Sequence, residues 1–237
     1  MMILGVDSSA KSASVAVVQD GAILGEFFVN HGLTHSQTLL PMIEHLMEVL
    51  DVQPSQLDVL AVNNGPGSFT GIRIGVACVK GIGFAGGQKC VGVSTLFSLA
   101  HNIGPYDGII CPVMDARCQQ VYNALFTWQD GKLVRLCEDR AISVEALKQE
   151  IISAGKNVIL VGDGASLCYN MISEEVPAVE LAREPLRYAR GSSVAMAAMQ
   201  CMDQAVSAEQ LTPTYLRPSQ AERERAQRQQ QQAANEV

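Results

Sequence analysis

Hydrophobic positions along the chain form two successive blocks, and the two blocks begin with the same order of predicted elements. Runs of alternating or continuously apolar residues predict strands, and apolar stripes at spacings of three and four residues predict helices. The first block predicts strands at 2–7, 12–19 and 22–30, a helix at 36–50, a strand at 57–63, a helix at 70–84, a strand at 90–93 and a helix at 95–102.

The second block starts after Gly104-Pro105 and repeats the order of three strands, a helix, a strand and a helix. It predicts strands at 108–115, 119–128 and 132–138, a helix at 144–154, a strand at 158–161, a short helix after Gly164, a strand at 176–181 and a helix at 191–206. We therefore expect an α/β fold with two similar βββαβα lobes, at 1–104 and 105–217. The Gln- and Arg-rich residues 218–237 are expected to form a disordered tail.

Composition narrows the class of protein further. A hydrophobic content of 48% with only 17% charged residues excludes a disordered chain. A formal charge of −7 argues against autonomous nucleic-acid binding, because such binding depends on Lys and Arg. The sequence has no signal-peptide pattern and no run of eighteen apolar residues, so a cytoplasmic protein without a membrane span is expected. Its 7 cysteines include no C-x-x-C pair, which favours buried reduced thiols over disulfides or a zinc site.

A glycine-rich loop between a predicted strand and a predicted helix carries the strongest candidate chemistry. Successive backbone N–H groups and a helix N-terminus together form an anion cradle. The loop is not a Walker A motif, since no Lys-Ser or Lys-Thr follows its last glycine. A nucleotide or anion site and a simple tight turn both remain open, and the candidate residues in this loop are Gly65, Gly67, Ser68, Thr70 and Gly71.

Asp7 and Ser8 end the first predicted strand, where an acidic hairpin of an actin-like ATPase holds phosphate and metal. They join the candidate nucleotide or anion site, although an Asp in such a turn also satisfies backbone amides. Asp115 and Gly162-Asp163-Gly164 hold comparable places in the second block but lack a glycine-rich phosphate turn. The chain therefore has the shape of an ATPase with an incomplete ATPase site.

The histidines and the helix glycines leave further alternatives open. His31 and His35 are four residues apart, but Gly32 separates them and no H-E-x-x-H motif is present, so no metal site is expected. Gly71 and Gly75 sit four apart in the helix at 70–84, where each glycine costs about 1 kcal/mol relative to alanine. Close packing against the helix at 36–50 or against a partner protein would offset that cost.

The eleven residues from Gly65 to Gly75 match the signature G-P-G-S-F-T-G-x-R-x-G of the bacterial TsaB family, also called YeaZ. Further matches lie at Ile3–Ser9, His35–Gln37, Gly92–Leu96, Asp115–Arg117 and Pro213–Arg217, so the resemblance covers about residues 1–217. It implies a two-lobed actin-like (ASKHA) fold whose lobes are ribonuclease-H-like. It also implies a non-catalytic scaffold and dimerisation subunit for threonylcarbamoyl transfer to N6 of adenosine 37 in tRNAs that read codons beginning with A.

The family resemblance further implies which partners the chain has. A catalytic TsaD-like paralogue carries the metal site, and a TsaE-like ATPase joins the complex. The chain would pair with itself when alone and would meet tRNA only indirectly. No firmly bound cofactor and no metal are expected, although ATP or ADP could lie at a shared interface.

The resemblance assigns the contact surface to the helices at 36–50 and 70–84. The interface residues expected from it are Leu39, Met42, Ile43, Leu46, Ile72, Arg73, Gly75 and Val76. Gly75→Arg is then expected to abolish partner binding and leave the fold intact. Two alternatives remain, namely an autonomous ATP-dependent small-molecule kinase that uses Asp7 and a metallopeptidase-like protein that uses His31 and His35.

Overall fold

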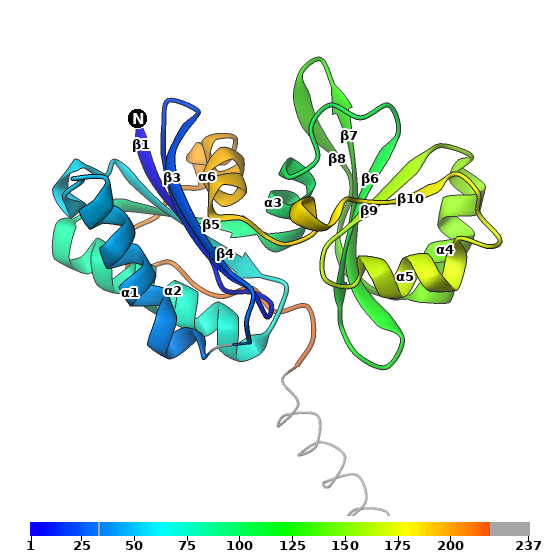
Figure 1. Cartoon of the computed structure of the whole chain (residues 1–237), viewed down its shortest axis with the longest axis horizontal. Helices are drawn as coiled ribbons and strands as arrows, with labels where there is room; N and C mark the ends of the chain where they lie inside the picture. Colours follow the sequence, from blue (N-terminus) through cyan, green and yellow to red (C-terminus); the bar gives the residue numbers. More distant parts are fainter. Residues whose placement is uncertain (33, 219–237) are drawn as a thin grey trace, which may run out of the picture.

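Two five-stranded sheets organise the chain in the computed structural model, which describes residues 1–32 and 34–218 (Figure 1). The first sheet has the order β3-β2-β1-β4-β5 and the second the order β10-β9-β6-β7-β8. The strands of the first sheet are β1 (Met2–Asp7), β2 (Ala13–Gln19), β3 (Ala22–Val29), β4 (Val59–Gly65) and β5 (Lys89–Ser94). The strands of the second are β6 (Ile109–Asp115), β7 (Gln120–Gln129), β8 (Lys132–Ser143), β9 (Val158–Val161) and β10 (Val179–Leu181).

Each sheet starts as an antiparallel meander and continues with parallel strands. In the first sheet β1 pairs antiparallel with β2 and β2 with β3, whereas β4 lies parallel to β1 and to β5. The second sheet has the same arrangement, with β6 between antiparallel β7 and parallel β9. Tight turns at Asp20-Gly21 and Asp130-Gly131 join the antiparallel strands, and all four of these residues have positive φ. The repeat expected from the sequence pattern is therefore present in the topology.

Two helices cover the outer face of each sheet. On the first sheet these are α1 (His35–Val49) and α2 (Phe69–Gly86), whose buried residues join one apolar core with β1, β2 and β4. On the second they are α4 (Val144–Ala154) and α5 (Ala165–Ile172). Ser68 caps α2 and Ser143 caps α4, since each hydroxyl accepts a backbone N–H of the first helical turn.

The inner face of each sheet is covered by a helix that the sequence places in the other predicted domain. α6 (Gly191–Met199) packs on β1, β2 and β4 of the first sheet, whereas α3 (Thr95–His101) packs on β6 and β7 of the second. The two helices also contact each other between the sheets (Figure 1). The predicted boundary, which placed all of 105–217 in the second lobe, is wrong because the inner face of the first sheet is buried by α6.

The first lobe is therefore the first sheet with α1, α2, α6 and the segment after it, and the second lobe is the second sheet with α3, α4 and α5. Val206 forms a bridge to Cys90 of β5, and Thr214 N donates to Asn64 O, so the chain stays on the first lobe after α6. Short 3₁₀ turns lie at Pro54–Gln56, Glu184–Leu186 and Met202–Gln204. The predicted tail at 218–237 lies, except for Pro218, outside the described residues.

Element boundaries otherwise follow the sequence predictions closely, with three differences. β8 continues to Ser143, the strand expected at 176–181 begins at Val179, and α6 ends at Met199 rather than near 206. By length and composition alone α2 could cross a membrane, and 33% of its residues are buried. Because it packs against β4 as a helix of the first lobe, this is weak evidence for a membrane span.

Candidate functional site

Asp7, at the end of β1, is fully buried. Its Oδ1 accepts hydrogen bonds from Ser9 Oγ at 2.6 Å and from Asn63 Nδ2 at 2.7 Å. Burial raises the pKa of the Asp7 carboxyl, and these hydrogen bonds oppose the rise. Its Oδ2 is buried and has no hydrogen-bond partner within the described residues. Oδ1 is therefore satisfied by the first lobe, whereas Oδ2 is enclosed without such a partner.

The glycine loop that follows β4 packs directly onto the turn that follows β1. A Cβ on Gly67 would come within 2.4 Å of Ser9 O, and one on Gly65 within 2.1 Å of Thr214 O. Both glycines also have positive φ, which L side chains rarely adopt. Ser68 N donates to Ser9 O at 2.7 Å. The glycines are thus required by close approach of the chain's own backbone.

The start of α2 is held in the same way. Ser8 Oγ donates to Gly71 O at 2.9 Å, and a Cβ on Gly71 would come within 2.1 Å of Ser8 O. Ser68 Oγ accepts from Gly71 N at 3.3 Å, while Thr70 is exposed. The structure therefore brings together the predicted residues of the β1 turn and of the loop. Nucleotide or anion binding by these residues stays a prediction.

The acidic residues of the second lobe bind backbone amides. Asp163 Oδ1 accepts from Asp115 N at 3.2 Å, and Asp115 Oδ1 accepts from Arg117 N at 2.8 Å. His35 Nε2 lies 2.7 Å from Ala10 O and so lines the β1 turn. Within residues 1–32 and 34–218, no group of three or more His, Cys, Asp and Glu side chains could hold a metal ion.

Most of the predicted interface residues lie in the core of the first lobe. Six of them, which were expected on an exposed face, are buried against the first sheet: Leu39, Ile43, Leu46, Ile72, Gly75 and Val76. Of the other two, Met42 is half-buried and Arg73 is exposed. The assignment of the buried six to a surface is wrong, because the apolar stripes of both helices cover their own sheet. The partner interface itself stays a prediction.

The Gly75→Arg substitution cannot serve as the test expected from the sequence. A Cβ on Gly75 would lie 2.6 Å from Ser8 Oγ and 3.2 Å from Val62 Cγ2. An arginine at this position would separate α2 from the β1 turn and from β4, so the fold would not remain intact.

The outward face of α2 carries a second apolar set that the sequence prediction missed, and single apolar residues are exposed on α1. Leu40 is 44% exposed, and Val49 and Phe84 are each 63% exposed. Ala77, Gly81 and Ala85 are also exposed and follow one another at intervals of four along α2. This i, i+4 spacing was visible in the sequence, but it runs parallel to the buried stripe, and the pattern alone does not tell the two faces apart.

Arg73 is held by residues of its own chain. Its Nε donates to Tyr215 Oη at 2.8 Å, and its guanidinium lies 3.9 Å from the centre of the Phe69 ring. The Phe69 and Tyr215 rings stack with centroids 4.5 Å apart. These side chains line a shallow hollow of about 620 Å³ together with Leu216, Arg217 and Pro218. Arg73 is thus held by Phe69 and Tyr215 of its own chain, and its place in a partner interface stays a prediction.

The sequence and the fold of this chain are similar to those of known proteins. Residues 31–225 match the profile of the family described as TsaD: tRNA N6-adenosine threonylcarbamoyltransferase. The chain is 30% identical over 174 residues to the tRNA threonylcarbamoyladenosine biosynthesis protein TsaB of Bacillus subtilis, which covers 73% of this chain and 76% of the relative. The Escherichia coli protein of the same name is 30% identical over 154 residues, 64% of each chain. The solved structure of YeaZ from Pseudomonas aeruginosa has a TM-score of 0.77 and 27% identity, covering 91% of this chain and 99% of that one.

Proposed function

Because the chain belongs to the TsaB (YeaZ) family of tRNA threonylcarbamoyladenosine biosynthesis proteins, we propose that it is the non-catalytic subunit that binds a TsaD-type threonylcarbamoyltransferase. The two-lobed actin-like fold serves here as a scaffold. The observation that carries this proposal is the apolar outward face of α2, defined by Ala77, Gly81, Phe84 and Ala85. Exposed apolar surface of this kind is typical of protein interfaces.

The composition of this face supports a helical partner surface. α2 has only two charged residues, Arg73 and Lys80, and both are engaged within the chain. Lys80 Nζ donates to the carbonyl oxygens of Glu209 and Leu211 at 3.0 Å each. The remaining outward positions of α2 are small or apolar, so another helix could approach the backbone closely.

The closed state of the residues around Asp7 supports a non-catalytic role. A phosphate-binding hairpin needs free backbone N–H groups and an accessible carboxylate. Here Asp7 is fully buried, and the glycines of the loop face backbone oxygens of Ser8, Ser9 and Thr214. These features favour the scaffold over the autonomous kinase, and binding of ATP or ADP at a shared interface stays a prediction.

A charge placed on the outward face tests the proposal. Ala77→Arg puts a guanidinium in the middle of the face without touching the core, since Ala77 is exposed. We expect it to weaken binding of the TsaD-type partner by at least about tenfold, because a charge would be buried without a counter-charge. Ala146→Arg, at an exposed alanine of α4 in the second lobe, is the matched control and should bind as the wild type does.

Isothermal titration calorimetry measures the affinity of the TsaD-type partner for the wild type, for Ala77→Arg and for Ala146→Arg. Reconstitution with the partner, a TsaE-like ATPase, tRNA, threonine, bicarbonate and ATP then measures the modified adenosine. Equal affinity of Ala77→Arg and wild type would place the interface elsewhere. Full modification of tRNA without this chain would overturn the scaffold role.

In the absence of the partner, we propose that the same face pairs two copies of this chain in a cytoplasmic homodimer. A symmetric pair requires a surface that is complementary to itself, and a stripe of small and apolar side chains meets this requirement. Ala77→Arg is expected to yield monomers in sedimentation velocity, whereas Ala146→Arg should retain the wild-type association state.

A further inference from the structure

Within residues 1–32 and 34–218, two segments of chain connect the lobes, and side chains of the other lobe contact each segment. The first connection is the junction of β5 and α3, where Ser94 ends a strand of the first sheet and Thr95 begins a helix on the second. The second connection is residues 182–190, between β10 and α6. In a two-lobed protein, rotation of one lobe against the other requires dihedral changes in such segments.

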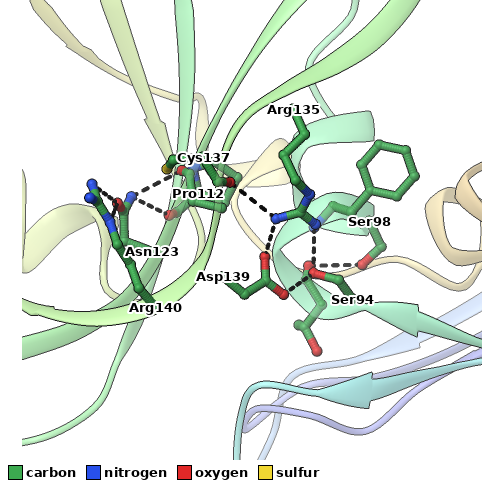
Figure 2. A network of polar contacts seen from close by, with 11 residues as sticks. Ser94, Ser98, Pro112, Asn123, Arg135, Cys137, Asp139 and Arg140 are labelled. Atoms are coloured by element: carbon green, nitrogen blue, oxygen red, sulfur yellow. Dashed lines mark hydrogen bonds and ion pairs between the residues drawn. The ribbon is translucent and has the colours of Figure 1, made fainter. Parts of the chain in front are cut away.

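Asp139 of β8 holds the first connection (Figure 2). Its Oδ2 accepts a hydrogen bond from Ser94 Oγ at 2.5 Å, and its Oδ1 accepts one from Arg135. Ser94 Oγ also accepts Phe97 N at 3.2 Å, so one hydroxyl both caps α3 and binds Asp139. The Arg135 guanidinium in turn lies 4.8 Å from the centre of the Phe126 ring in the second lobe. Turning β5 relative to β8 would break this half-buried network.

Asn102 holds the second connection. It directly follows α3, and its Nδ2 donates to Leu186 O at 2.8 Å and to Tyr188 O at 2.7 Å. Its Oδ1 accepts from Ser193 Oγ of α6 at 2.5 Å. One amide side chain of the second lobe therefore fixes both the connecting segment and the helix on which that segment ends. Any rotation between the lobes would leave this amide without its partners.

Further contacts join the lobes away from the connections. Arg217, on the segment that follows α6, donates from Nη1 to Ala116 O of the second lobe at 2.8 Å. Phe97 of α3 packs against the apolar core on the inner face of each sheet. Polar links and shared packing thus act at several places along the contact between the lobes.

We propose that these links lock the two lobes in one relative orientation, so that the protein is a rigid body without a hinge-closing motion. Asp139 and Asn102 are the locking residues, because each bonds to a segment in which the rotation would have to occur. This inference concerns the isolated chain and does not depend on the proposed partner. The outward face of α2 then keeps a fixed position relative to the second lobe.

Pulsed electron–electron resonance on the full-length chain measures the distance between the lobes. Spin labels are placed through unnatural amino acids at the exposed positions Glu44 of α1 and Asn170 of α5, which leaves the native cysteines untouched. The wild type should give one narrow distance distribution, identical with and without magnesium ATP. The Asp139→Asn and Asn102→Ala double variant should broaden that distribution by about twofold or more.

Matched controls replace an exposed Asp and an exposed Asn far from the connections. Asp130→Asn and Asn157→Ala should keep the wild-type distribution. If the double variant proves unfolded by circular dichroism, Ser193→Ala removes a single link and should still broaden the distribution relative to both controls. A wild-type distribution that has two maxima or shifts with magnesium ATP would overturn the proposal. Unchanged distributions in the folded link variants would overturn it as well.

Discussion

At the scale of single residues, the glycines of α2 show how one residue type serves different purposes. Gly75 lies against Ser8 and Val62 with no room for a Cβ, whereas a Cβ on Gly81 would meet no atom within 4 Å. Both positions have the same helical pattern in the sequence, and only the neighbours supplied by β1 and β4 distinguish them. The sequence identified the glycines as unusual but could not say which of them were needed for packing.

This difference predicts opposite effects of the same substitution. Gly75→Ala should lower the free energy of unfolding by about 1–3 kcal/mol, because the added methyl group is too close to Ser8 Oγ. Gly81→Ala should raise it by about 0.5–1 kcal/mol, since alanine is the better helix former and has free space. Urea denaturation measures both values, and equal changes in the two variants would contradict the packing described for α2.

His101, at the end of α3, is a second residue whose surroundings determine a measurable property, here its pKa. Its ring lies 4.9 Å from that of Phe97 and 6.2 Å from that of Trp128. Burial lowers the pKa of His101 from about 6.5 to about 4. Between these two values the unfolded chain binds a proton that the folded chain does not bind. Protonation therefore favours unfolding as the pH falls.

We expect protonation of His101 to lower the free energy of unfolding by up to about 3 kcal/mol as the pH falls from 6.5 to 4. Urea denaturation at several pH values should show a smaller loss over this range in His101→Gln than in the wild type. His45→Gln, at an exposed histidine of α1, should follow the wild-type profile. A His101→Gln profile parallel to the wild type would contradict the buried, neutral state of this histidine.

At the scale of elements, α1 and α2 were predicted at nearly the observed positions, yet their faces were assigned incorrectly. The apolar stripe that includes Leu39 and Ile72 packs on the first sheet, while Leu40, Val49 and Phe84 remain exposed. Hydrophobic periodicity finds the dominant stripe, and in a helix of a globular protein this stripe covers the helix's own core. The comparison of Ala77→Arg with Ala146→Arg is therefore the informative experiment for this face, whereas a change at Gly75 would report on folding.

At the scale of the whole molecule, the exchange of α3 and α6 makes the lobes dependent on each other. The inner face of the first sheet is buried by Val194, Ala195, Ala197 and Ala198 of α6. Leu96 and Leu99 of α3 contribute to the inner core of the second sheet. A chain divided at the boundary predicted from the sequence would leave each half with one uncovered sheet face.

This dependence predicts the behaviour of fragments. Residues 1–104 and residues 105–217, produced separately, should each aggregate, because one fragment lacks α6 and the other lacks α3. When the two fragments are co-expressed, they should form a soluble complex that co-purifies in size-exclusion chromatography. A soluble and cooperatively folded 1–104 fragment on its own would contradict the role of α6 in the first lobe.

The sequence by itself determined the order and type of the elements, the repeat of the two lobes and the family, because these depend on local periodicity and on contiguous motifs. Only the tertiary structure decided which side of each helix is buried, where α6 docks and which partner holds Arg73. These properties depend on contacts between residues far apart in the chain. Arg73 and Tyr215 are separated by 142 positions, and Ser94 and Asp139 by 45. Periodicity within one element contains no information about such distant neighbours.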